Sequence, residues 1–163
     1  MSSVSAFWGD REVSRSAAAE AISAVLVGIR AVDPLLATWR KQGGSRAQAL
    51  AQPMIDPGPD AVEARLTVNR KDVGREPIPE LGFGFSAWNG ASEPTDHAAV
   101  SATIGLHAQN PNLRNSFVVT LPSSWEERDP RLHSLVEVLV GNLRPDEVVH
   151  FGPEDRIVLW SRE

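Results

Sequence analysis

Two long stretches of the sequence have the apolar spacing of an amphipathic helix. Between Ser14 and Val32, apolar residues recur every three or four positions among good helix formers. The same spacing runs from Leu132 to Leu143, after Asp129-Pro130 and before Arg144-Pro145. Aspartate caps a helix start and proline fits the first helical position. These stretches therefore predict two principal helices.

Three shorter helices are predicted between the two long ones. They run from Asp33-Pro34 to Trp39, from Ser45 to Pro53, and from Asp60 to about Leu66. In the second of them, Ser45 and Gln48 have capping-box spacing, so the Ser45 hydroxyl is expected to accept from the Gln48 amide. Asp60 and Glu63 repeat that spacing in the third.

The apolar period changes to two after residue 80, which is typical of strands. Strands are predicted at Leu81 to Trp88, Ala98 to Leu106 and Phe117 to Leu121, with Asn89-Gly90 as a turn after the first. The connections are too short for crossover helices, so the three strands are expected to form an antiparallel meander.

A closing hairpin is predicted in the tail, from Val148 to Phe151 and from Ile157 to Trp160. Arg70 to Pro79 is polar and is predicted to be a loop. Together the patterns predict one α+β domain over residues 1–163, with a largely antiparallel sheet of about five or six strands packed against two main helices and several short ones.

Composition places the chain among ordinary globular domains. It has 163 residues and no cysteine, which excludes disulfides and thiolate metal sites. The first ten residues lack a signal peptide's basic and apolar regions, and no stretch reaches the ~20 apolar residues of a membrane span. A cytoplasmic protein is expected. The net charge of -5 disfavours direct nucleic-acid binding, which depends on clustered lysine and arginine.

One stretch has the letters of a dinucleotide-binding fingerprint, Gly82-Phe83-Gly84-Phe85-Ser86-Ala87. Its glycines lie inside a predicted strand, and a turn follows where the phosphate-binding helix should begin. The glycines are better explained by close packing of a ring or a helix on that strand. No cofactor is expected.

Catalytic and metal-binding patterns are also weak. No Gly-x-Ser-x-Gly pattern surrounds any serine, and no histidine pair has the i, i+4 spacing of a metal site. The four histidines, His97, His107, His133 and His150, are interpreted as surface or hydrogen-bonded residues. Glu126, Glu127 and Asp129 precede a helix, where the helix dipole favours negative charge. We therefore expect no enzymatic activity.

The aromatic residues are unusual, with five tryptophans and no tyrosine. Trp8, Trp39, Trp88 and Trp125 all lie near the end of a predicted element or in a connection. Tryptophan is common at binding hot spots, although most tryptophans in a domain of this size belong to the core. One or two of them are expected at an interface.

Five short strings follow one another along the chain: Phe7-Trp8-Gly9-Asp10-Arg11, Asp33-Pro34 with Trp39, Ser45-Arg46-Ala47 with Leu50, Ile78-Pro79-Glu80-Leu81-Gly82-Phe83, and Trp88-Asn89-Gly90. In their order and spacing these strings resemble the immunity protein 52 family of bacterial polymorphic toxin systems. The resemblance covers Phe7 to about Leu121, roughly two-thirds of the chain.

The resemblance implies a cytoplasmic antitoxin that binds and neutralises a cognate secreted toxin, often one delivered by type VI secretion. The toxin implied is a nuclease of restriction-endonuclease fold, which the antitoxin would block by covering its active site. An acidic inhibitor suits the basic groove of a nuclease. The candidate partner-binding residues are Trp8, Asp10, Arg11, Trp88, Asn89, Glu126 and Glu127.

Two other functions remain open at this point. One is a small-molecule-binding or enzymatic domain, with the glycine-bearing strand and Trp88 forming the floor of a pocket. The other is an adaptor or chaperone of a secretion system, which would use an exposed groove or strand edge. A monomer and a homodimer are both compatible with the sequence.

Overall fold

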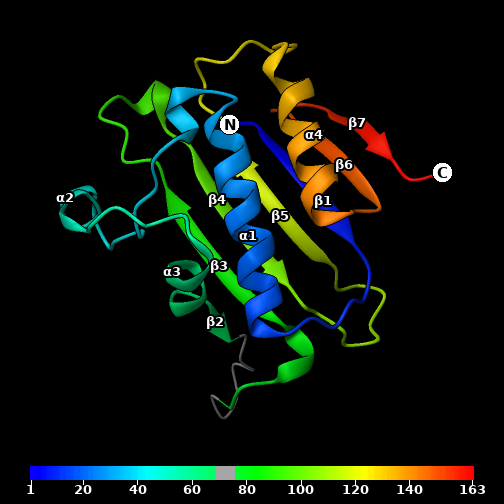
Figure 1. Ribbon diagram of the computed structural model, residues 1–163. Coiled ribbons are helices and arrows are strands. Elements are labelled where there is room, and N and C mark those ends of the chain that lie inside the picture. The colour runs from blue at the N-terminus through cyan, green and yellow to red at the C-terminus, as the bar shows by residue number, and fades with distance from the viewer. Residues whose placement is uncertain (69–75) are drawn as a thin grey trace.

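The computed structural model describes residues 1–68 and 76–163, which fold around a single antiparallel sheet (Figure 1). The strand order is β2-β3-β4-β5-β1-β6-β7. The strands are β1 (Ser3–Trp8), β2 (Thr67–Val68), β3 (Phe83–Trp88), β4 (Ala99–Ile104), β5 (Asn115–Thr120), β6 (Glu147–Phe151) and β7 (Arg156–Ser161). The α-helices are α1 (Arg15–Arg30), α2 (Arg46–Ala51), α3 (Pro59–Ala64) and α4 (Arg131–Leu143). Short 3₁₀ turns lie at η1 (Pro34–Leu36), η2 (Pro79–Leu81) and η3 (Pro94–Asp96).

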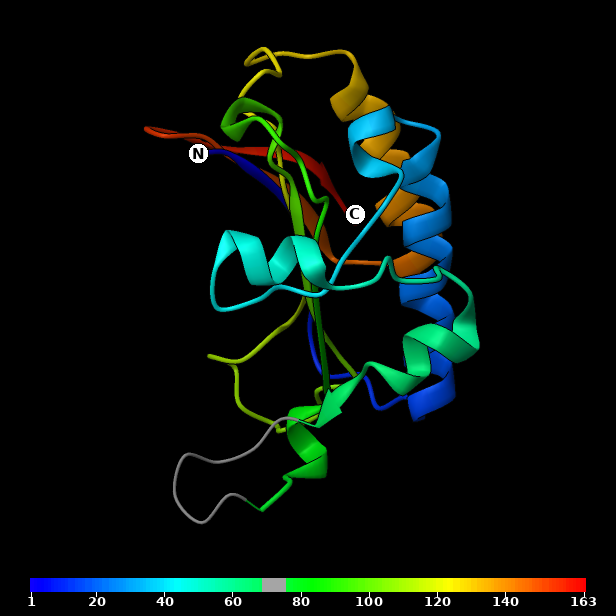
Figure 2. The ribbon, with the colours of Figure 1, turned by 90° about the vertical axis from the view of Figure 1, so that its left-hand side faces the viewer.

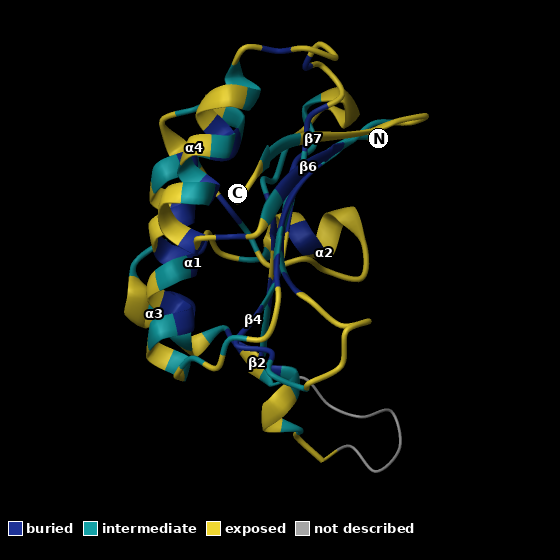
Figure 3. Cartoon of the chain, turned by 90° about the vertical axis from the view of Figure 1, so that its right-hand side faces the viewer, coloured by how far each residue is buried: buried dark blue, intermediate teal, exposed yellow. Residues whose placement is uncertain are grey.

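The predicted α+β class is confirmed, with seven strands instead of five or six. The meander β3-β4-β5 and the hairpin β6-β7 are both present and antiparallel. Figures 2 and 3 show α1, α3 and α4 on one face of the sheet and α2 on the other. The core lies between the three helices and the sheet face that they cover, where alternate strand residues such as Val4, Val100 and Phe117 are fully buried.

Helix α1 has Ser14 as its N-cap, whereas α4 begins at Arg131, so Pro130 takes the N-cap position and not the first helical position that was predicted for it. The Ser14 hydroxyl accepts from the Ala17 amide at 3.1 Å, and an Asp129 carboxylate oxygen accepts from the Arg131 amide at 3.0 Å. The helices pack closely at Gly28, where a Cβ would lie 2.7 Å from a Val138 methyl carbon. A glycine at this position therefore lets α1 and α4 approach on the same side of the sheet.

The short helices agree with prediction in part. Helix α2 has the expected cap, with the Ser45 hydroxyl accepting from the Gln48 amide at 3.2 Å. The turn η1 ends at Leu36, before Trp39, because the following chain bridges to β3. Helix α3 starts at Pro59, so Asp60 lies in its first turn and is not the cap.

Two strands were missed by the sequence patterns. Strand β1 lies in the middle of the sheet between β5 and β6, with Val4 opposite both Val119 and His150. Its alternation of serine with small and aromatic residues gives only a weak apolar signal. Strand β2 has two residues and directly precedes the predicted loop from Arg70 to Pro79, of which residues 70–75 lie outside the described part.

Of the two fingerprint-like glycines, Gly84 lies in strand β3 and Gly82 lies just before it, at the end of η2. Gly82 has a φ of +72°, and a Cβ there would lie 2.6 Å from the Ile104 carbonyl oxygen and the Leu106 nitrogen. The close approach is therefore to the backbone at the end of β4, and not to a ring or a helix as expected. Strand β3 begins at Phe83 and not at Leu81 as predicted, because the 3₁₀ turn η2 occupies the residues before Gly82.

An ionic network joins the end of α1 to the start of α4. The guanidinium of Arg131 donates to both Asp129 and Asp33, and it lies 4.3 Å from the centre of the Trp125 ring. The Asp33 side chain also accepts from the Leu35 amide at 2.7 Å and so caps η1. Hydrogen bonding to Arg131 lowers the pKa of Asp129 to about 2. The network holds both helix-opening Asp-Pro pairs in one place.

Candidate functional site

The seven predicted partner-binding residues lie at opposite ends of the sheet. Trp88 is the last residue of β3 and pairs with Ala99 of β4. Through the pairing of β4 with β5 and of β5 with β1, Ser3 lies in the same cross-strand row. Trp8 is the last residue of the interior strand β1 and lies at the opposite end of the strands, paired with Asn115. Asn89, Glu126 and Glu127 lie at the Trp88 end, and Asp10 and Arg11 lie at the Trp8 end.

The residues at the Trp8 end hold the fold together. Trp8 is only 2% exposed and belongs to the core. Arg11 donates to the carbonyl oxygens of Leu143 at 2.7 Å and Arg144 at 2.9 Å, so it satisfies the C-terminal end of α4. Asp10 accepts from the Gln109 amide at 2.8 Å. Each charged residue thus has its own backbone partner, and the two do not form an ion pair with each other.

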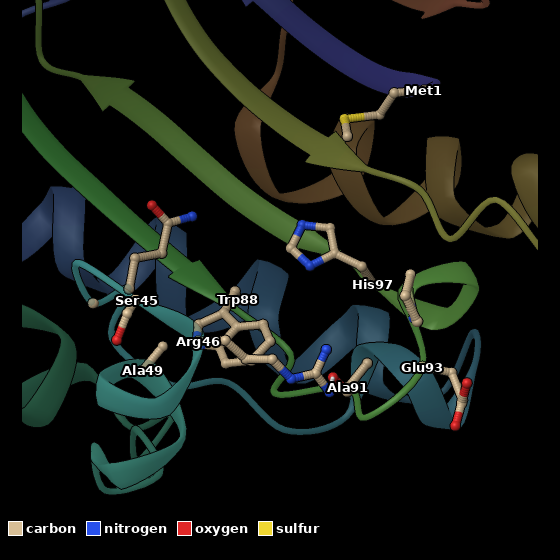
Figure 4. A pocket seen from close by; sticks show the side chains of 11 residues that line it. Met1, Ser45, Arg46, Ala49, Trp88, Ala91, Glu93 and His97 are labelled. Carbon is tan, nitrogen blue, oxygen red and sulfur yellow. Dashed lines mark hydrogen bonds between the residues drawn. The ribbon is translucent and has the colours of Figure 1, made fainter.

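The Trp88 end contains a pocket of about 460 Å³ between α2 and the connection from β3 to β4. Figure 4 shows Trp88, the last residue of β3, and His97 from that connection, with Arg46 of α2 alongside. The Trp88 and His97 rings are 6.0 Å apart and inclined by 31°. The indole nitrogen of Trp88 is buried and has no acceptor among the described residues. We call this cavity the Trp88 pocket.

Arg46 attaches α2 to the wall of the Trp88 pocket. Its guanidinium donates to the carbonyl oxygens of Ala91 and Ser92, and this holds the helix against the loop after β3. Arg40 strengthens the same junction, because its backbone exchanges two hydrogen bonds with Trp88, of 2.7 and 3.0 Å. Arg46 therefore holds α2 to the loop after β3, and Arg40 holds the segment before α2 to the end of β3.

Asn89 shapes the loop that carries His97. Its amide nitrogen donates to the carbonyl oxygens of Leu35 at 3.0 Å and Asp96 at 2.8 Å. Its side-chain oxygen accepts from the backbone amides of Ala91 and Ala98. All four bonds join the Asn89 side chain to backbone groups, so Asn89 fixes the position of the loop between β3 and β4.

Replacing Asn89 with alanine is expected to lower the free energy of unfolding by about 2 kcal/mol, because buried backbone groups lose their partners. The loop should also loosen, which a faster amide exchange at Ala91 and Ala98 would show. Asn112→Ala is the matched control, since Asn112 is exposed and uses only its backbone amide in a local turn. Unchanged exchange at both amides would contradict this role for Asn89.

Two loops that are distant in sequence meet beside the pocket. The Ser124 amide donates to the Thr95 carbonyl oxygen at 3.0 Å, and the Ser124 hydroxyl bonds to the Asp96 carboxylate at 3.3 Å. Residues 91–97 and 122–128 carry four carboxylates and only one guanidinium. We call these carboxylates the acidic rim: Glu93, Asp96, Glu126 and Glu127. Glu93 also lines the Trp88 pocket.

The sequence patterns identified half of this site. Trp88, Asn89, Glu126 and Glu127 were candidates, whereas Arg46, Glu93 and His97 were not. The only local signal was the tryptophan beside the Asn89-Gly90 turn. Grouping Glu93 with Glu126 requires the contact between two loops about 30 residues apart, and spacing along the chain does not report such a contact.

The pocket offers an aromatic floor with charged groups at its edge. Among residues 1–68 and 76–163, no serine or threonine hydroxyl is hydrogen-bonded to a histidine, and no cluster of three metal-ligating side chains is found. In the same residues, no helix has both the length and the apolar character needed to cross a membrane. A scan of protein-family models and a search of curated proteins each gave no match to the chain.

Proposed function

We propose that this protein is a cytoplasmic immunity protein that binds a cognate secreted toxin and blocks its active site. The toxin class proposed is a nuclease of restriction-endonuclease fold. The protein acts by binding and not by catalysis. The sequence resemblance to the immunity protein 52 family supports this proposal, and so does the chemistry of the Trp88 end.

The observation that carries the proposal is the joining of two acidic loops by hydrogen bonds. The bonds between Ser124 and residues 95 and 96 bring Glu93 and Asp96 to the same end of the sheet as Glu126 and Glu127. Glu93, Glu126 and Glu127 are exposed. The two loops that carry these carboxylates are joined before binding, so ordering the loops costs little conformational entropy when a partner arrives.

The partner suited to this surface has a basic groove. A nuclease must concentrate positive charge where it holds the phosphates of its substrate, and an acidic rim can occupy the same positions. Opposite charge speeds association, whereas slow dissociation requires buried aromatic or apolar contacts. The Trp88 pocket beside the rim provides room for a partner side chain against an aromatic floor.

The proposal is tested with the toxin domain encoded beside the gene of this protein. Co-expression should rescue cells from the toxin, and the dissociation constant should be nanomolar or tighter and weaken with salt. The triple variant Glu93→Gln, Glu126→Gln, Glu127→Gln should weaken binding by about a hundredfold or more, since each close interfacial charge pair contributes upward of ~1.5 kcal/mol.

A matched control removes the same number of charges elsewhere. Glu20, Glu154 and Glu163 are exposed and make no side-chain contacts within the described residues, so their replacement by glutamine should leave affinity within about threefold. Equal losses in the two triple variants would exclude the acidic rim as the docking site. Absence of both rescue and binding would exclude the immunity function itself.

A further inference from the structure

The edge of β3 is only partly covered. Strand β2 pairs with Gly84 and Phe83 at one end, and Arg40 bridges to Trp88 at the other. Ser86 lies between these two attachments. In an antiparallel pair, the backbone groups of alternate residues point to the same side. The backbone amide and carbonyl of Trp88 point toward Arg40, on the side of β3 away from β4. Ser86 lies two residues earlier, so its backbone amide and carbonyl point to the same side.

A cavity of about 590 Å³ lies at this gap, and its polar wall is made of hydrogen-bond donors. The hydroxyls of Ser86, Ser101 and Thr103 come from adjacent positions on β3 and β4. Lys41 and Arg65 also line it, and within the described residues neither side chain has a hydrogen bond or ion pair. We call this cavity the β3-edge pocket.

The charge of the β3-edge pocket is opposite to that of the molecule. The chain has 21 acidic and 16 basic residues, yet among the described residues two cations and no carboxylate line this cavity. Lys41 and Arg65 line the same cavity without an oppositely charged partner among the described residues, and an anion bound there would be attracted to both. The Ser86 amide has no partner within residues 1–68 and 76–163, and it supplies a further donor of the kind that binds anions in backbone sites.

The remaining wall of the cavity is apolar. Ile55, Leu66 and Phe85 line it, and each is at least nine-tenths buried. A bare inorganic ion would leave most of the cavity unfilled and would not contact this wall. A ligand with a charged group and an organic part would use both walls.

We propose that the β3-edge pocket binds a phosphate-bearing small molecule. Its phosphate oxygens accept hydrogen bonds from the Ser86 amide and the strand hydroxyls and pair with Lys41 and Arg65. Its organic part lies against Ile55 and Leu66. This site is separate from the Trp88 pocket and does not depend on the proposed immunity function.

The test uses inorganic phosphate, a nucleoside monophosphate and acetate, each titrated into the ¹⁵N-labelled full chain. Both phosphate compounds should shift the Ser86 amide resonance in a saturable manner, and the nucleotide should bind at least about tenfold more tightly than phosphate because it also contacts the apolar wall. Equal responses to acetate and phosphate would overturn the assignment of phosphate. No saturable shift at Ser86 would overturn the site.

Variants separate this pocket from general attraction to charge. Arg65→Gln and Lys41→Gln should each weaken phosphate binding roughly tenfold, and Ser101→Asp should abolish it by placing a carboxylate in the pocket. Arg30→Gln removes an exposed cation from the end of α1, outside the pocket, and should have no effect. Circular dichroism checks that each variant is folded. Equal weakening by Arg30→Gln and Arg65→Gln would contradict the proposal.

Discussion

Replacing Trp8 with alanine is expected to lower the free energy of unfolding by about 3 to 5 kcal/mol, the range for deleting a large buried aromatic side chain. Trp8 lies at the end of the central strand β1 and is among the largest fully buried side chains. Its removal leaves a cavity and also takes away the ring beneath the Arg11 guanidinium, which lies 5.6 Å from the ring centre. Urea denaturation measures the change.

Trp8→Phe is the matched variant, since it keeps an aromatic ring of smaller volume and should cost less than half as much. Toxin binding by folded Trp8→Ala protein should stay unchanged, because the residue lies at the end of the sheet opposite the acidic rim. Normal stability combined with a large loss of toxin affinity would instead make Trp8 an interface residue.

Arg131→Ala is expected to destabilise the protein by about 2 to 4 kcal/mol. Two carboxylates, Asp129 and Asp33, are 7% and 6% exposed and would lose their common cation. Leaving a buried charge unpaired costs ~3 to 5 kcal/mol, and the expected loss is smaller here because Arg131 itself is 37% exposed. Thermal or urea unfolding measures it, and Arg128→Ala, an exposed neighbour without side-chain contacts in the described residues, should be close to neutral.

The same network predicts how stability changes in acid. The pKa of Asp129 is lowered from 3.8 to about 2 by its hydrogen bonds with Arg131. Because the pKa of Asp129 is lower in the folded state, its ionised carboxylate stabilises the fold. This stabilisation is fully present above pH ~4 and is lost as the pH falls toward ~2. In the Arg131→Ala variant, the free energy of unfolding should fall less between pH ~4 and ~2, because Asp129 no longer has its partner. A decline of the same size in both proteins would assign the acid sensitivity to other carboxylates.

The two pockets lead to separate conclusions. The sequence suggested a single pocket with the glycine-bearing strand and Trp88 as its floor. In the structure Trp88 and Gly84 line different cavities, one beside the acidic rim and one between two cations. A toxin experiment therefore tests the first, and a phosphate titration tests the second. Either proposal can fail without affecting the other.

Local pattern was enough to predict most of the individual elements. Helices α1 and α4, the meander and the closing hairpin each follow from apolar spacing within one segment of chain. The caps at Ser14 and Ser45 were equally predictable, because a cap joins residues only three positions apart. The α+β class followed from the order of these elements.

Tertiary structure alone decided where those elements meet and what their side chains do. The first strand owes its central place to pairing with β5 and β6, more than 100 residues away, and this pairing buries Trp8. Nothing local distinguishes Trp8 from Trp88, since each ends a strand and is followed by a glycine within two residues. The acidic rim and the β3-edge pocket likewise depend on contacts between distant segments. Sequence periodicity reports the local backbone, whereas a binding site needs side chains brought together by long-range packing.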